Sequence, residues 1–249
     1  MEVKGRFGSL TDIGLVRKSN EDKALSLIDA QGNVLLCVCD GMGGYMKGDF
    51  ASKIAIDVVS AAFKGHIKWI FDFQVKIWIS KVVKSINYSV YSESHDSERF
   101  KGMGTTLCMA IFFKNKIFVV NVGDSRCYRL EEEEVVQITH DQTFVQYMVN
   151  KGEMDEQEKL ISKDRHVLMN YIGGNKDVNY TIDVFKNEKK TIMLCSDGLY
   201  NNASDRQIFS ALASNERLDQ KINTLIGIAN ANGGSDNIAI SIWEPYKHD

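Results

Sequence analysis

Four aspartates stand at the ends of apolar segments, where their carboxylates could gather around metal ions. Three follow such a segment directly and the fourth opens the last one: Asp40 after VLLCVC, Asp124 after IFVVNVG, Asp197 after TIMLCS and Asp236 before NIAISIW. Carboxylates held together beside an apolar core repel one another, and cations relieve that repulsion. Oxygen ligands select hard cations such as Mg2+ or Mn2+. We therefore expect a site for several such ions at one sheet edge.

The alternative is that each aspartate only ends its strand as a turn former. Aspartate favours turns, and glycine follows both Asp40 and Asp197. Any one of the four, taken alone, fits that role. Four equivalent positions favour the metal site, because the glycine-containing turns at three of them let the backbone approach a ligand.

The segments that must position these aspartates show strand and helix patterns. Six have strand length and are apolar or alternating: 34–39, 107–113, 117–122, 135–139, 191–195 and 238–243. Four longer segments repeat apolar residues every three or four positions and predict amphipathic helices: 50–63, 71–91, 205–213 and 218–230. The short turn at 114–116 implies antiparallel pairing, and the grouping of helices between strands predicts layers of helix on sheet.

Composition narrows the class of protein. The 249 residues are 44% hydrophobic and 25% charged, which predicts a globular chain, and we expect one domain over 1–249 because no linker divides it. The net charge of -3 gives no basic surface for nucleic acid. No signal peptide or spanning segment is apparent, so we expect no membrane partner. Five cysteines, an odd number in mostly apolar segments, suggest a reducing cytoplasm. A monomer is expected.

Six short segments identify a family. They are RKSNED (17–22), CDGMGG (39–44), GMGTT (102–106), VGDSR (122–126), CSDGL (195–199) and SDN (235–237). In kind and order they resemble the motifs of the PPM, or type 2C, protein serine/threonine phosphatases of bacteria, and the resemblance spans nearly the whole chain. It implies an α+β fold, a four-layer α-β-β-α sandwich of two antiparallel sheets flanked by helices.

The resemblance also implies roles for the metal ligands. Asp40 would bridge two Mg2+ or Mn2+ ions, and the carbonyl of Gly41 would bind one of them. Asp197 and Asp236 would complete the other, while Glu21 would serve the second metal directly or through water. A water shared by the two ions would then attack the phosphorus of a phosphoserine or phosphothreonine in line with the leaving oxygen.

Three further residues receive roles from the same resemblance. Asp22 would orient metal-bound water, and Asp124 would hold a third, weaker ion together with Asp197. Arg17 matches the arginine that binds the substrate phosphate, and its planar fork suits two phosphate oxygens. The expected partners are phosphoprotein substrates and an opposing serine/threonine kinase.

The chain departs from some relatives at several positions. Met42 stands where eukaryotic members often carry histidine, so a metal-bound water is the expected proton donor to the leaving oxygen. The family's Asp-His-Ser appears as residues 141–143, Asp-Gln-Thr, and we expect His140 and His166 to be structural. The polar segment 151–166 matches a flap beside the active site, where loops select substrates.

Several residues and motifs bear on alternative functions. Thr105 and Thr106 could bond metal waters or simply pack at a strand start. No arginine stands six residues after any cysteine, and Asp49 follows Gly48 where a P-loop needs lysine, which excludes two other phosphate-cleaving classes. The remaining alternatives are an inactive phosphatase fold that binds phosphoproteins as a regulatory module, and a hydrolase of small phosphoesters.

Overall fold

The chain folds into two five-stranded antiparallel sheets packed face to face. The computed structural model describes residues 4–43 and 47–246, so Gly44, the last residue of the CDGMGG segment, lies outside it. The first sheet has the strand order β1 (Gly5–Asp12), β12 (Ile238–Pro245), β11 (Ile192–Cys195), β8 (Arg126–Leu130) and β9 (Val135–Gln137). The second has the order β10 (Thr181–Lys186), β7 (Lys116–Val122), β6 (Leu107–Phe113), β3 (Val34–Cys39) and β2 (Lys23–Ile28).

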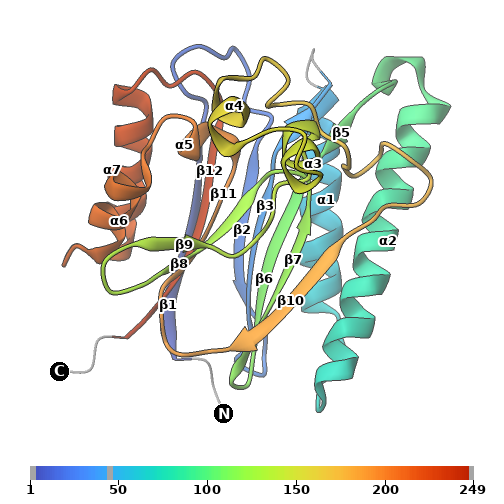
Figure 1. The fold of residues 1–249 in the computed structure, drawn as a ribbon. Coiled ribbons are helices and arrows are strands. Elements are labelled where there is room, and N and C mark those ends of the chain that lie inside the picture. Colours follow the sequence, from blue (N-terminus) through green and yellow to red (C-terminus); the bar gives the residue numbers. More distant parts are fainter. Residues whose placement is uncertain (1–3, 44–46, 247–249) are drawn as a thin grey trace.

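Helices cover the outer face of each sheet (Figure 1). The second sheet is covered by α1 (Lys47–Lys64) and α2 (Asp72–Asp96), which is followed by the short η1 (Glu98–Phe100). The first is covered by α5 (Asp197–Tyr200), α6 (Asp205–Ala213) and α7 (Leu218–Ala231). The predicted α-β-β-α sandwich is therefore confirmed.

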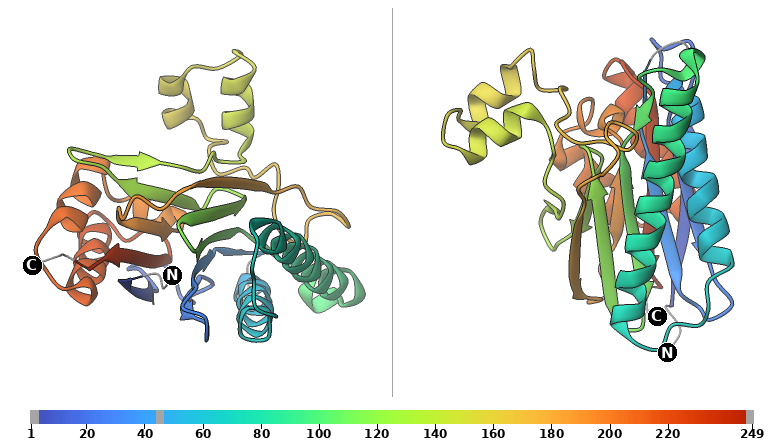
Figure 2. Two further views of the ribbon diagram at one scale, coloured as in Figure 1. Left: turned by 90° about the horizontal axis from the view of Figure 1, so that it is seen from below. Right: turned by 90° about the vertical axis from the view of Figure 1, so that its right-hand side faces the viewer.

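Two short helices stand apart from the sandwich. They are α3 (Phe144–Asn150) and α4 (Glu156–Ile161), which project from its edge in both views of Figure 2. A two-stranded antiparallel sheet of β4 (Gly41–Met42) and β5 (Gly104–Thr105) lies where β3 ends. These elements, with the loops near them, surround one end of the sandwich.

Strand β3 shows why this part of the sequence is uniformly apolar. Leu35, Cys37 and Cys39 pack in the core beneath α1 and α2, whereas Val34 and Leu36 pack in the core between the sheets. Alternate residues of a strand face opposite sides, so a strand buried on both sides needs apolar residues at every position. The same holds for β6 and β7.

The ten predicted elements are all present. Their ends match within a few residues, and the largest shift is at α2, which continues to Asp96. Strands β1, β2, β4, β5 and β10 and helices η1, α4 and α5 were not predicted. The unpredicted strand β10 is largely exposed, and its pairing with the buried β7 supplies the stability that its own side chains lack. None of the helices in the described ranges is long and apolar enough to span a bilayer.

A buried ion pair joins α7 to β12. The Lys221 ammonium donates to Glu244 Oε2 at 2.8 Å and to the carbonyl of Leu212 at 2.8 Å, and both charged side chains are almost fully buried. Neither charge can be solvated by water there, so each depends on the other.

We predict that Glu244→Ala lowers the free energy of unfolding by about 3 kcal/mol, because it leaves a buried ammonium without its counter-charge. The double variant Lys221→Met/Glu244→Ala should recover most of that loss, since it removes both charges. Urea unfolding of the three proteins measures this, and a single variant as stable as the double variant would contradict it.

Candidate active site

A cavity of about 860 Å3 opens at the end of the sandwich where α3 and α4 lie. It is lined by residues from loops that are far apart in the sequence: Arg17, Glu21, Asp40, Gly41, Asp124, His166, Asp197 and Asp236 are among them. Every site residue predicted from the sequence except Asp22 lines this one cavity, and Asp22 lies buried behind it.

The two sheets each contribute two of the strand-end aspartates. Asp40 follows β3 and Asp124 follows β7 in the second sheet, while Asp197 follows β11 and Asp236 precedes β12 in the first. Because these strand ends lie at the same end of the sandwich, their carboxylates line one cavity, as predicted, although they come from both sheets and not from one sheet edge.

Threonines fix the backbone at Asp40. The hydroxyl of Thr106 accepts from the Asp40 amide at 2.9 Å, and that of Thr105 donates to the Asp40 carbonyl at 2.9 Å. The Thr106 amide donates to the same carbonyl, and Ser125 hydrogen-bonds to the Thr106 hydroxyl at 2.7 Å. Both threonines are buried, and they position the aspartate through its main chain.

Asp22 and Asp40 form a carboxyl pair. Burial raises the pKa of Asp22 to about 7, repulsion from Asp197 adds to it, and hydrogen bonds with Ser196 and Asp40 act in the opposite direction. Removal from water, followed by repulsion from Asp22 and Asp197, raises the pKa of Asp40 well above its ordinary value. Two carboxyl groups that are removed from water and repel each other resist full ionisation unless a cation is present. Oδ2 of Asp22 is buried and has no hydrogen-bond partner.

Asp124 is crowded in the same way. Burial raises its pKa to about 7, and the nearby Asp197 adds to the effect. Its backbone carbonyl accepts from the Tyr200 hydroxyl at 3.1 Å, and the Arg126 guanidinium lies 3.6 Å from the Tyr200 ring centroid. Arg126 in turn makes a bidentate ion pair with Asp141. The backbone of Asp124 is therefore fixed by Tyr200, which Arg126 and Asp141 hold in place.

Asn237 ties the loop that carries Arg17 to the start of β12. Its side chain accepts from the Glu21 amide at 2.8 Å and donates to the carbonyls of Ile13 and Ser19, each at 2.9 Å. Arg17 lies on this loop, and its Nη2 is 2.7 Å from Asp236 Oδ2. The asparagine of the SDN segment therefore has a structural role that brings Arg17, Glu21 and Asp236 together.

Two glycines allow a close approach beside Glu21. A methyl group on Gly48 would lie 2.2 Å from Glu21 Oε2 and 2.4 Å from the carbonyl carbon of Gly41. A methyl group on Gly41 would lie 2.2 Å from the Gly48 carbonyl oxygen. The carboxylate of Glu21 therefore lies against the backbone that presents Gly41 to the cavity.

His166 was expected to be structural; the structure places it at the cavity, and its role stays a prediction. Its side chain is half exposed, lines the cavity, and places Nδ1 3.5 Å from Asp197 Oδ2. The hydrogen bond with Asp197 raises the pKa of His166. His166 ends the predicted flap, 151–166. Arg165 of the flap and Leu168 just after it also line the cavity. The role of His140, which is exposed, stays a prediction.

The carboxylates surround the cavity without forming a tight cluster. Within 4–43 and 47–246, no group of three or more histidine, cysteine, aspartate or glutamate side chains could by itself hold a metal ion.

Known proteins share this sequence pattern. A family model described as protein phosphatase 2C matches residues 16–239. The serine/threonine phosphatase stp of Listeria monocytogenes is 31% identical over 94% of this chain and 93% of that protein. The serine/threonine protein phosphatase PstP of Mycobacterium tuberculosis is 32% identical over 98% of this chain, which spans 46% of that protein.

Solved structures share the fold. The serine/threonine phosphatase Stp1 of Staphylococcus aureus superposes with a TM-score of 0.92 at 28% identity, over 99% of this chain and 98% of that one. The catalytic domain of PstP in complex with two manganese ions gives a TM-score of 0.83 at 30% identity, over 97% of this chain and 98% of that one. The chain belongs to the protein phosphatase 2C family. This confirms the predicted resemblance and the predicted enzyme class, a protein serine/threonine phosphatase.

We predict that the chelated protein becomes less stable as pH rises from about 4 to above 7. The pKa of Asp22 rises from 3.8 to about 7 on folding, as does that of Asp124, so the folded chain binds more protons than the unfolded chain in this window. The protonated carboxyls stabilise the folded chain fully below pH 3.8, the pKa in the unfolded chain. This stabilisation is lost as the pH rises through about 7, the pKa in the folded chain. Thermal melts in EDTA at pH 6 and pH 8 measure the difference.

The variants Asp22→Asn and Asp124→Asn should each reduce this pH dependence and raise the melting temperature at pH 8, because an amide is never charged. Asp177→Asn, in an exposed loop, is the matched control and should leave it unchanged. Equal slopes in all four proteins would show that the buried carboxyls do not titrate as described.

We predict that Gly48→Ala destabilises the protein by about 1–3 kcal/mol, because the Gly41 backbone cannot move away from a new methyl group without disturbing the cavity. Gly227→Ala in α7 is the control, since nothing lies within 4 Å of its added Cβ, and it should be neutral or stabilising. Denaturant unfolding compares the two, and equal effects would contradict the close approach.

Proposed function

We propose that the chain is a metal-dependent phosphatase that hydrolyses phosphoserine and phosphothreonine monoesters of proteins, with one catalytic domain over 1–249. The observation that carries this proposal is the set of aspartates with raised pKa values around one cavity, with Arg17 at its rim. Membership of the protein phosphatase 2C family supports it, as does the binding of two manganese ions by the PstP catalytic domain.

The donor set fits two core ions of Mg2+ or Mn2+. Asp40 would bridge them, and the Gly41 carbonyl, Glu21, Asp197 and Asp236 would supply the other oxygen ligands. All of these donors are oxygens, which suits hard cations. The raised pKa of Asp40 and the unpartnered oxygen of Asp22 are the features that a cation or its water would satisfy. Asp124 with Asp197 would hold a third ion.

The chain's own residues orient the reactants. When bound, the cations supply Lewis acidity and a water nucleophile at neutral pH. The threonines hold the backbone of Asp40, and Asp22, buried behind the cavity, would orient water at the cations. Arg17 uses one Nη2–H on Asp236 and keeps its other donors for two oxygens of the substrate phosphate.

Phosphoproteins are the substrate class that the surroundings of the cavity favour. The flap places Arg165 and His166 on the cavity wall, and its exposed Leu160 and Ile161 offer apolar contacts to a polypeptide. An opposing serine/threonine kinase would supply such substrates, and the cytoplasm is the compartment that fits five reduced, buried cysteines. Turnover of a phosphothreonine peptide, compared with that of a nucleotide, separates this function from small phosphoester hydrolysis and from an inactive binding module.

We predict that EDTA abolishes turnover of a phosphothreonine peptide and that Mn2+ or Mg2+ restores it. Asp40→Asn and Asp197→Asn should each remain inactive after the metal is added, since each has lost a bridging or terminal ligand. The matched control Asp177→Asn should behave like the unaltered chain. Undiminished turnover after complete chelation would contradict metal-dependent hydrolysis.

We predict that Arg17→Ala lowers kcat/KM for that peptide roughly ten- to a hundredfold, mainly through KM, because a bidentate charge-assisted contact is lost. Arg17→Lys should fall between Ala and the unaltered chain, since it keeps the charge without the fork. Arg206→Ala, an exposed arginine of α6, is the control. Steady-state kinetics decide: if Arg17→Ala matches Arg206→Ala, Arg17 does not bind the phosphate.

A further inference from the structure

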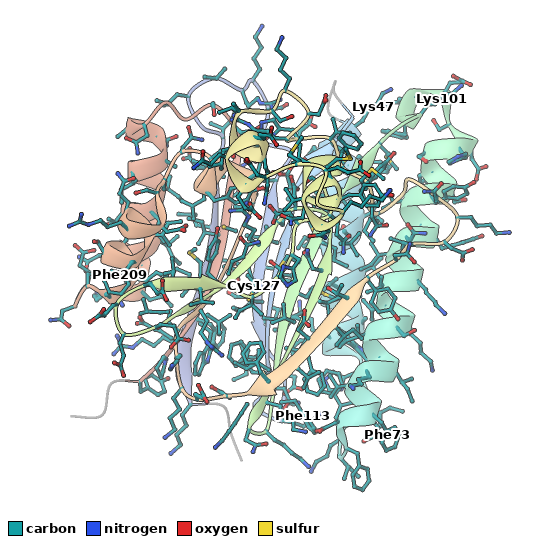
Figure 3. All side chains as sticks on the ribbon, viewed as in Figure 1. Lys47, Phe73, Lys101, Phe113, Cys127 and Phe209 are labelled. Atoms are coloured by element: carbon teal, nitrogen blue, oxygen red, sulfur yellow. The ribbon has the colours of Figure 1, made fainter. Side chains whose placement is uncertain are left out.

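The end of the molecule opposite the acidic cavity exposes a group of large apolar side chains. These side chains surround the connection between α1 and α2, and each is at least half exposed. We call them the apolar tip: Ile67, Ile70, Phe71, Phe73 and Ile77. Ile67 is 88% exposed. In Figure 3, Phe73 lies at the lower end of the molecule, whereas Lys47 and Lys101 lie at the upper, cavity end. Exposed apolar groups gathered in this way mark an interaction site.

The backbone beneath the apolar tip is held firmly. His66 Nε2 lies 2.8 Å from Asp29 Oδ2, and the His66 ring stacks on Trp69 with ring centroids 3.8 Å apart. Trp69 itself is buried, and Lys114 Nζ donates to the Ile70 carbonyl at 2.6 Å. The connection therefore projects its apolar side chains outward from a fixed base.

A groove of about 700 Å3 continues the tip between α1 and α2. Its lining is largely apolar and includes Val58, Ala62, Trp69, Phe73 and Trp78. The groove and the tip together form one continuous apolar surface, because Ile67, Phe73 and Ile77 belong to both.

Positive charge surrounds this surface, although the chain as a whole carries -3. Residues 64–84 contain a single acid, Asp72, which is ion-paired with Lys116. The same segment contains five exposed lysines: Lys64, Lys68, Lys76, Lys81 and Lys84. Its charge thus complements an anionic partner.

We infer that the apolar tip docks on an anionic lipid surface, with its apolar side chains in the interfacial region and the lysines against lipid phosphates. Apolar groups flanked by lysines are the composition that binds such surfaces. The connection and the start of α2 form the lowest part of their side of the molecule in Figure 1, so a flat bilayer can reach them. A protein partner with an acidic helix would fill the groove and leave the exposed Ile70 and Phe71 uncovered, because neither lines the groove, so such a partner is the less favoured occupant.

This docking differs from the sequence-based expectation of no membrane partner. That expectation rested on the lack of a spanning segment, and peripheral docking needs none. Bound in this way, the chain would hold its acidic cavity on the side away from the bilayer, open to substrates in solution. The inference does not depend on the proposed catalytic activity.

Flotation of the full chain with vesicles tests the inference. The chain should float with phosphatidylcholine vesicles that contain phosphatidylglycerol, should not float with phosphatidylcholine alone, and should be released by high salt. Trp78 lines the groove and is only partly buried, so tryptophan emission should shift to the blue on binding.

Two double variants and their controls locate the contact. Lys68→Glu/Lys76→Glu should weaken vesicle binding at least about 25-fold, because each lysine removed costs roughly fivefold in affinity. Ile67→Ser/Phe73→Ser should abolish the emission shift. Lys176→Glu and Tyr88→Ser, exposed residues away from the tip, should bind like the unaltered chain. Circular dichroism melts establish that each variant is folded.

Equal flotation with both lipid compositions, or no flotation with either, would overturn the inference. So would tip variants that bind vesicles as well as their controls do. A blue shift produced by an acidic amphipathic peptide but not by vesicles would assign the surface to a protein partner instead.

Discussion

Repulsion among carboxylates that are held together at one end of the β-sandwich is the constraint on which the rest of the structure depends. Asp22, Asp40 and Asp124 are all withdrawn from water, and each lies within the field of Asp197. A folded chain keeps such groups together only when protons or cations neutralise them. The hydrogen bonds from Thr105 and Thr106 prevent the backbone at Asp40 from yielding to that repulsion.

The two sheets share the work of assembling the site. Each contributes two aspartates at its strand ends, and the apolar core between the sheets fixes how those ends face each other. Close packing of that core makes the spacing of the aspartates a property of the whole sandwich rather than of any one loop. Asn237 extends this control to the loop of Arg17 and Glu21, which has no regular structure of its own.

The sequence predicted the buried parts of this arrangement and missed the parts defined by contacts. Strands β3, β6 and β7 were predictable because burial on both sides leaves long apolar segments, and the aspartates were predictable because they interrupt those segments. Strand β10 was not, since its stability comes from pairing with β7. His166 was missed because only the fold brings it to Asp197. The one available signal was its place in the predicted flap. The roles of Thr105, Thr106 and Asn237 likewise needed coordinates.

The central claim is that cations replace protons among these carboxylates, and calorimetric titration of the chelated protein with Mn2+ tests it most directly. Titrations at pH 6.5 in buffers of different ionisation enthalpy give the number of protons released per chain. With carboxyl pKa values near 7, binding should release protons at pH 6.5 and almost none at pH 9. Mn2+ binding without proton release at pH 6.5, or with equal release at both pH values, would contradict the account.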